Sequence, residues 1–292
     1  MSNVQNMGTN FPAECVNQVF SAVRGKSSLA ALCEQIPVAF TGSDLFVFQM
    51  DKEVALVGEG EAKGNGGITA EPTKVVPVKI EYGARVSNEF MTASEEKKLE
   101  ILKAFNEGFA KMAARGLDIM AMHGVNPRTG ETSNLIKHYF DKNTTNVITY
   151  AAASCDDNVD DAAEKIGDYD VTGIAMAKTF ASALGKLEGA NGAKLYPELK
   201  WGGQPKSVNG VPTSVNSTVS FKNSKDMAIV GDFANMFKWG YAKDVKMEVI
   251  PYGDPDNTGK DLAGHNQVYI RAEAYIGWAI LDEKAFARVV AQ

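Results

Sequence analysis

The sequence has 292 residues, 45% of them hydrophobic and 23% charged, which is an ordinary globular composition with length for one large domain or two smaller ones. Its net charge of −6 argues against a sequence-independent clamp on nucleic acid, because such clamps neutralise phosphates with clustered Lys and Arg. No run approaches the roughly 18 apolar residues that cross a bilayer, and the start of the chain shows no secretory signal. Cys15, Cys33 and Cys155 are irregularly spaced, so we expect buried thiols rather than bridges or metal ligands.

The first part of the chain predicts an arm and then a hairpin. Residues 1–36 are small and polar with weak periodicity, so they are expected to form an arm without a core of its own. A strand is expected over 43–50, and a second over 73–86, where Pro77 restricts it to a sheet edge because proline cannot donate to a ladder. The glycine-rich segment 56–72 lies between them, so the two strands predict an extended hairpin, here called the flap.

A long helix follows the flap. Thr92 to Glu95 form a capping-box pattern, apolar residues then recur at three- and four-residue steps, and Gly124 followed by Pro127 provides the stop. About 30 helical residues at ~1.5 Å each reach about 45 Å, which is long for a globular helix. The residues expected on its buried face are Leu102, Phe105, Phe109 and Met112.

The end of the chain predicts a hairpin of matching length. Residues 243–250 alternate in polarity, and 267–280 place Val268, Ile270 and every second residue after them on one apolar face. The second strand has 14 residues, which at ~3.3 Å each reach about 46 Å. A helix and a hairpin of equal reach predict an elongated α+β slab in which the helix lies along the sheet.

Residues 125–239 are expected to form a mixed α/β unit between the long helix and the final hairpin. A helix is predicted over 171–189, capped by Asp170, and short strands are predicted over 145–153, 217–223 and 226–233. Gly-, Asn- and Pro-rich loops connect these elements.

The glycine-rich part of the flap does not fit a nucleotide site. Gly58, Gly60 and Gly64 are spaced one residue too far apart for the dinucleotide fingerprint, and a strand rather than a helix is expected after them. Gly25-Lys26-Ser27 resembles the end of a phosphate-binding loop, but Phe20 occupies the position of its first glycine. We therefore expect no nucleotide cofactor.

Metal and catalytic motifs are equally weak. The three histidines are scattered without ligand spacing. Asp254 to Gly259 begin like a calcium loop, but Pro255 interrupts it and His265 stands where the bidentate Glu belongs. The acidic run 156–161 fits a helix N-terminus better than an ion site, and no nucleophile elbow is present. No metal and no catalytic residue is expected.

Three segments in this order resemble the major capsid protein of tailed phages, which has the Hong Kong 97-type fold. They are VALVGEGEAKGNGGITAEPTKVVPVKIEYGARVSNEF at 54–90, AIVGDFANMFKWGYAKDVKMEVI at 228–250 and QVYIRAEAYIGWAILDEKAFARV at 267–289. The resemblance covers nearly the whole chain and implies an α+β fold with an N-terminal arm, an extended loop, a peripheral domain with a long spine helix and a long β-hairpin, and an α/β axial domain.

The domain bounds that the resemblance implies are an arm at 1–36, an extended loop at 47–80, a peripheral domain at 37–46, 81–122 and 240–279, and an axial domain at 123–239 and 280–292. The extended loop would reach over a neighbouring subunit, and its glycines would supply backbone freedom and little bulk there. The assembly residues expected on it are Glu59, Gly60, Lys63, Gly64, Asn65, Gly66 and Gly67.

The resemblance also implies a function. Such a chain is no enzyme; it assembles through hexamers and pentamers into an icosahedral virion shell around double-stranded DNA, which it does not bind sequence-specifically, after synthesis in the host bacterial cytoplasm. A separate scaffolding protein, a portal and a maturation protease would be its partners. Lys52 and Lys63 are available for cross-linking between subunits, but no matched Asn or Glu is evident. The alternatives are the shell protein of an encapsulin-like bacterial nanocompartment and a small-molecule-binding α/β enzyme.

Overall fold

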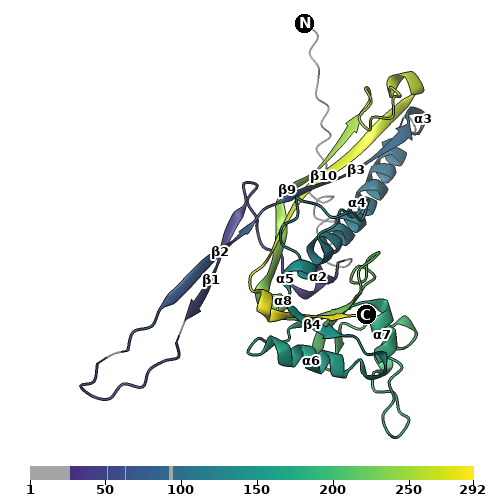
Figure 1. The fold of residues 1–292 in the computed structure, drawn as a ribbon. Helices are drawn as coiled ribbons and strands as arrows, with labels where there is room; N and C mark the ends of the chain where they lie inside the picture. The colour runs from purple at the N-terminus through teal and green to yellow at the C-terminus, as the bar shows by residue number, and fades with distance from the viewer. Residues whose placement is uncertain (1–26, 51, 63, 92–94) are drawn as a thin grey trace.

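The computed structural model describes residues 27–50, 52–62, 64–91 and 95–292. These residues form a mixed α+β fold with a two-stranded, a three-stranded and a six-stranded sheet. Figure 1 shows the two-stranded flap projecting from the rest of the molecule, a long slab that extends away from the flap base, and the six-stranded sheet at the same end of the slab as that base. None of the helices in these residues has the length and apolar character needed to span a bilayer.

The slab is a long antiparallel sheet with a long helix on it. Its strands are β3 (Val78–Ser87), β10 (Gln267–Ile280) and β9 (Phe237–Ile250), with β10 in the centre. Helix α4 (Glu95–His123) runs along the sheet (Figure 1). The predicted match in length is confirmed, since 29 helical residues and 14 strand residues both reach about 45 Å. The face of β10 that begins with Val268 and Ile270 is buried along the whole strand.

Two strand boundaries differ from the sequence prediction. The strand expected over 73–86 is divided at Val76–Pro77 into β2 (Ile68–Val75), which belongs to the flap, and β3, which lies at the edge of the slab as Pro77 indicated. Strand β9 begins six residues before the predicted start at 243, because Phe237, Trp239 and Tyr241 continue its buried face.

The buried stripe of α4 confirms most of its predicted core. Leu102 and Phe109 are buried, and Phe105 is partly buried against the slab. The prediction that Met112 lies on the buried face is wrong, because 60% of its surface is exposed. At about 100° per residue, Met112 lies roughly 80° from the line through Leu102 and Met120, so Ala113 and Leu117 occupy the buried stripe instead. Gly124, with φ +67, ends the helix as predicted; Thr92 to Ser94 of the expected capping box lie outside the described residues.

The six-stranded sheet combines residues from the middle of the chain with its last strand. Its order is β4 (Asn146–Thr149), β11 (Phe286–Val290), β8 (Asp226–Gly231), β5 (Gly173–Met176), β7 (Val211–Val215) and β6 (Ser207–Val208). Helices α6 (Asp157–Ile166) and α7 (Lys178–Leu184) pack on it over a second hydrophobic cluster, which includes Cys155, a buried free thiol as expected. The short remaining helices are α2 (Ser28–Leu32), α3 (Asn88–Met91), α5 (Phe140–Asn143), α8 (Phe233–Met236) and the 3-10 turns η1 (Ala152–Ser154), η2 (Pro197–Gly202), η3 (Ala263–His265) and η4 (Glu283–Ala285).

Two predicted elements in this region are wrong. Residues 171–189 do not form one helix capped by Asp170, because Gly173–Met176 form β5, buried between β8 and β7, and the helix starts only at Lys178. A single buried strand followed by a helix gives the same unbroken apolar run as one helix. Residues 217–223 form turns instead of a strand, and Lys222 there has the left-handed φ of +49. The strands expected over 145–153 and 226–233 are present as β4 and β8 but are shorter, because Ala152–Ser154 form the turn η1 and α8 begins at Phe233.

The described end of the expected arm is tied to the long helix. Asp118 of α4 is completely buried and accepts hydrogen bonds from the Ser27 hydroxyl and from the backbone N–H groups of Ser28 and Leu29, at 2.8 and 3.2 Å for the last two. It also accepts from the Thr218 hydroxyl at 2.7 Å. One carboxylate therefore joins α2, α4 and the turn before β8.

We expect Phe109→Ala to lower the free energy of unfolding by about 3–5 kcal/mol, because the truncation leaves a cavity between α4 and the slab. Met112→Ala, on the same helix but at an exposed position, is the matched control and should change it by about 0.5 kcal/mol or less. Denaturant unfolding of the purified proteins measures both. Equal losses for the two variants would contradict the assigned helix face.

We expect Asp118→Ala to lower the free energy of unfolding by about 3 kcal/mol or more, since it leaves two backbone donors of α2 buried without an acceptor. Asp168→Ala, at an exposed carboxylate, serves as the control and should be close to neutral. Denaturant unfolding measures both variants. A decrease in the free energy of unfolding of less than about 1 kcal/mol for Asp118→Ala would contradict the role given to this carboxylate.

Candidate assembly interface

The flap carries an apolar face that its own subunit leaves exposed. Strand β1 (Ser43–Met50) pairs with β2 in continuous antiparallel register, from Ser43 opposite Val75 to Met50 opposite Ile68. Directly opposed residues share a face. We call this face the apolar ribbon; its members are Phe46, Phe48, Met50, Ile68, Ala70 and Pro72. The exposed fraction of the surface is 73% for Phe48 and 81% for Met50.

The opposite face of the flap is turned toward its own subunit. Val47, Thr69 and Thr73 border a hollow of about 440 Å³, whose other wall is formed by residues 280–284 between β10 and β11. Because side chains alternate between the two faces of a strand, the apolar ribbon points away from the subunit that carries it. A contact for the ribbon must then come from outside this subunit.

The base of the flap is packed into the slab. Val75 is completely buried in a small cluster with Val38 and Ala279. Gly277 on β10 is required there, since a Cβ at that position would lie 2.7 Å from Cγ1 of Val75. The base is thus fixed by packing.

The predicted assembly residues are gathered at the tip. Glu59, Gly60, Gly64, Asn65, Gly66 and Gly67 are all exposed, and Lys63 lies outside the described residues. The N–H of Glu61 donates to the carbonyl of Gly58 at 3.2 Å, and Gly60 between them has φ +84. Lys52 closes the tip by donating to the carbonyl of Asn65 at 3.1 Å. Strand β2 follows the tip, so the glycines do not lead into the helix N-terminus that a phosphate loop needs.

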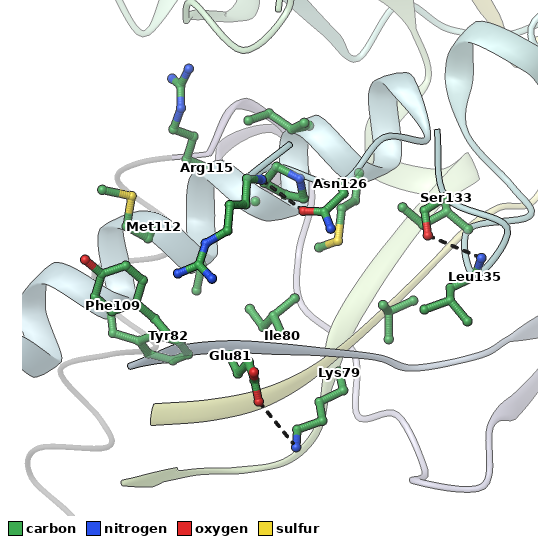
Figure 2. A pocket seen from close by; sticks show the side chains of 18 residues that line it. Lys79, Ile80, Glu81, Tyr82, Phe109, Met112, Arg115, Asn126, Ser133 and Leu135 are labelled. Atoms are coloured by element: carbon green, nitrogen blue, oxygen red, sulfur yellow. Dashed lines mark hydrogen bonds and ion pairs between the residues drawn. The ribbon is translucent and has the colours of Figure 1, made fainter. Parts of the chain in front are cut away.

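An open groove of about 470 Å³ lies between α4 and β3 (Figure 2). Phe109 and Met112 reach it from the helix and Ile80 and Tyr82 from the strand, and Figure 2 shows Leu135 at its far end. Its charged lining residues are Lys79, Arg115, Arg128 and Glu81. Arg128 is exposed and has no ion-pair partner in the described part of the chain. The groove is therefore an apolar surface with a net positive rim.

The calcium-like loop holds a guanidinium group in place of an ion. Arg85 on β3 donates to Asp254 at 2.6 Å, to both oxygens of Asp256 and to the Thr258 hydroxyl at 2.6 Å. These hydrogen bonds, with the neighbouring charges, raise the pKa of Arg85 and lower that of Asp256. Arg85 thus pins the loop between β9 and β10 onto β3, and it supplies the positive charge that a cation would bring.

One charged cluster was not anticipated from the sequence. His123, at the end of α4, lies 2.9 Å from Asp141 of α5 and 3.8 Å from Asp226 of β8. Arg288 of β11 contacts both carboxylates, at 3.0 and 2.8 Å. We call these four side chains the junction cluster. They come from four elements spread over 166 positions of the sequence, so spacing carried no signal for it.

The apolar ribbon was also missed as a site, although its signal was present. Phe46, Phe48 and Met50 stand at every second position of the first strand, and Ile68 is two residues before Ala70 in the second. An alternating strand normally buries its apolar face. The sequence does not reveal that no other part of the same chain covers this one.

Comparison with known proteins agrees with this geometry. Residues 8–291 match the sequence model of the phage capsid family. The structure is similar to that of a chain from Mycobacterium phage Ogopogo, with 28% identity, a TM-score of 0.75, and coverage of 91% of this chain and 92% of that one. A chain from Gordonia phage Cozz has 21% identity and a TM-score of 0.74, over 91% of this chain and 87% of that one.

A more distant similarity joins the chain to the capsid of an empty GTA particle computed with C5 symmetry, at 17% identity and a TM-score of 0.65, over 91% of this chain and 90% of that one. No curated protein sequence matches the chain. The matched family is structural rather than enzymatic, which excludes the alternative of a small-molecule-binding enzyme and favours a phage shell over a bacterial nanocompartment. The chain belongs to the phage capsid family and is a major capsid protein, a subunit of the icosahedral shell of a tailed phage.

Proposed function

We propose that the shell is built from hexamers and pentamers in which the flap of each subunit lies on its neighbour. The observation that carries this proposal is the apolar ribbon, six exposed residues in register on one face of β1 and β2. A two-stranded hairpin is marginally stable in water by itself, and an exposed apolar patch of this kind marks an interaction surface. A neighbouring copy supplies the cover in every subunit of a closed shell.

In this arrangement most of the slab belongs to the peripheral domain, formed by residues 37–46, 81–122 and 240–279, while 123–239 and 280–292 form the axial domain around the centre of each capsomer. The ends of the slab strands at 78–80, 237–239 and 280 extend beyond these bounds. Support for the axial domain comes from α6 and α7, which pack on the six-stranded sheet over a hydrophobic cluster of their own. The main cluster, however, extends from the slab to Phe233 and Phe286 near the sheet. The two domains therefore share a packed boundary.

The groove between α4 and β3 is the surface we assign to the neighbour's flap. Residues 43–75 contain six acidic residues and three lysines, a net charge of −3. The charged residues that line the groove are three cations and Glu81. Opposite charges at the rim guide the register of an interface whose central contacts are apolar. The groove offers such an apolar centre through Met112, Tyr82 and Leu135, which are exposed.

The other partners follow from the resemblance to tailed-phage capsids. We propose a separate scaffolding protein, a portal and a maturation protease, together with packaged DNA that is not bound sequence-specifically. The net charge of −6 supports the last point, since a shell that is not basic overall does not hold its DNA tightly.

Replacing Phe48 and Met50 together by Ser should abolish or destabilise closed shells while each subunit stays folded, because both side chains are exposed in the subunit and their burial arises only on assembly. Negative-stain microscopy and light scattering measure the particles, and circular dichroism checks the fold. Thr69→Ser, on the opposite face of the flap, is the matched control and should assemble normally. Shells of normal size and stability from the double variant would overturn the proposal.

Reversing the charge at the groove should also impair assembly. Arg128→Glu is expected to slow shell formation at low salt by about tenfold, since rim charges act mainly on the association rate. Adding Glu59→Lys and Glu61→Lys on the flap should restore part of the rate, whereas Lys137→Glu, a reversal outside the groove, should leave it unchanged. Time-resolved light scattering gives the rates, and an unchanged rate for Arg128→Glu would show that the flap docks elsewhere.

A further inference from the structure

The junction cluster lies where the long helix meets the six-stranded sheet. His123 is the last residue of α4, Asp141 is in α5, Asp226 begins β8 and Arg288 is in β11. Figure 1 shows this end of α4 beside α5, next to the sheet that contains β4. Asp226 is completely buried and His123 nearly so. Any change of charge here acts on the contact between the slab and the sheet.

The hydrogen bonds of His123 fix where its protons are. Its Nε2 lies 2.8 Å from the carbonyl oxygen of Thr218, which can only accept, so Nε2 carries a hydrogen. Its Nδ1 lies 2.9 Å from Oδ2 of Asp141. A nitrogen lone pair and a carboxylate oxygen repel each other at that distance, so a proton must lie between them. Oδ2 of Asp226 receives no hydrogen bond from any donor in the described residues.

The charges of the cluster lead to the same result. Two carboxylates and the guanidinium of Arg288 sum to −1 in a site with little access to water, and one further proton makes the cluster neutral. A divalent metal ion is the other candidate, because the ligand atoms of His123, Asp141 and Asp226 lie within 4.8 Å of one another. With Arg288 already present, such an ion would leave a charge of +1, so a proton fits this site better.

We propose that the junction cluster is a proton-operated joint: with its proton bound, it ties the end of α4 to α5, β8 and β11, and its deprotonation at mildly alkaline pH loosens this tie. In the described part of the chain, the charged groups that His123 contacts are Asp141 and Asp226, and Arg288 contacts both of these carboxylates. The loosened joint lets the slab and the six-stranded sheet shift relative to each other.

The pKa shifts agree in sign. Burial raises the pKa of Asp226 to about 7, with a further contribution from Asp141. Burial by itself lowers the pKa of His123, but its hydrogen bond to Asp141 and the carboxylate charges outweigh burial and raise it. A group whose pKa is higher in the folded state stabilises the fold fully at pH values below its unfolded-state pKa. This stabilisation is lost as the pH rises through its folded-state pKa. The pKa of Asp141 is lowered, so its own contribution is lost only in acid.

Hydrogen exchange read by mass spectrometry tests the joint in the purified full-length protein at about pH 6 and about pH 8.5, on either side of the range in which His titrates. The exchange rates are first corrected for the intrinsic pH dependence of exchange. Peptides from the end of α4, β8 and β11 should then open about tenfold more often at the higher pH. A tenfold change is expected because a pKa that is one unit higher in the folded state changes the opening equilibrium by a factor of ten. Flap peptides should show no such difference. Equal opening of the junction peptides at both pH values would overturn the proposal.

Asp141→Asn provides the matched variant, because Arg288 then balances Asp226 and the amide N–H of the new side chain can donate to Nδ1 of His123 without the extra proton. The pH difference at the junction peptides should disappear in it, and should persist in His138→Gln, which changes an exposed histidine. His123→Gln, whose side chain does not titrate, is the second variant if Asp141→Asn does not fold. A folded variant that keeps the full pH difference contradicts the proposal. The proposal is also contradicted if the purified protein contains one equivalent of a divalent metal and EDTA, rather than high pH, increases exchange in the junction peptides.

Discussion

The structure depends on the burial of one face of β10 along its entire length. Every second residue from Val268 to Ile280 is buried, and the strand is paired on both sides, with β3 and with β9. A strand of this length cannot be covered by a helix of ordinary size, so α4 must run the full length of the sheet. Gly83 on β3 lets the sheet stay paired around Tyr269, whose ring lies where a Cβ would be. The elongated slab follows from this single requirement.

The flap shows the opposite situation, because its apolar ribbon has no cover within the chain. The slab completes its core in one subunit, and α6 and α7 complete theirs, whereas Phe48 and Met50 remain in solvent. The subunit thus separates residues that stabilise its own fold from residues that, in the proposed assembly, are covered only by a neighbouring copy. This separation explains how a chain can fold first and assemble afterwards.

Long periodic elements could be predicted from the sequence, and short or buried ones could not. The alternation of apolar residues in 267–280 correctly predicted both ends of β10, and the three- and four-residue spacing in 95–123 correctly predicted α4. Each pattern was long enough to distinguish a strand period from a helix period. Gly173–Met176 was assigned to a helix because a short strand buried on both faces has no alternation. Met112 was misplaced by one position within a correct helix, where its neighbour Ala113 is small enough to be overlooked.

The assembly site was only partly predictable for a related reason. The glycines of the tip indicated a loop that reaches outward, but the ribbon became visible only when the register paired Phe48 with Ala70 and left both exposed. The junction cluster depends on the fold entirely, since His123 and Arg288 meet only after β11 joins the six-stranded sheet. Ionic contacts between remote elements leave no periodic trace in a sequence.

The way in which the flap joins the slab allows a small bend near its base to move its far end by several ångströms. Only Val76 and Pro77 separate β2 from β3, and Gly42, with φ +97, makes the corresponding bend before β1. The eight residues of β1 form an arm of about 26 Å, so a bend of roughly 10° beyond the packed base moves the far end by about 5 Å. Neighbours in the proposed hexamers and pentamers would stand at different angles. A small bend of the arm beyond Val75 would accommodate that difference and leave the packing of Val75 in place.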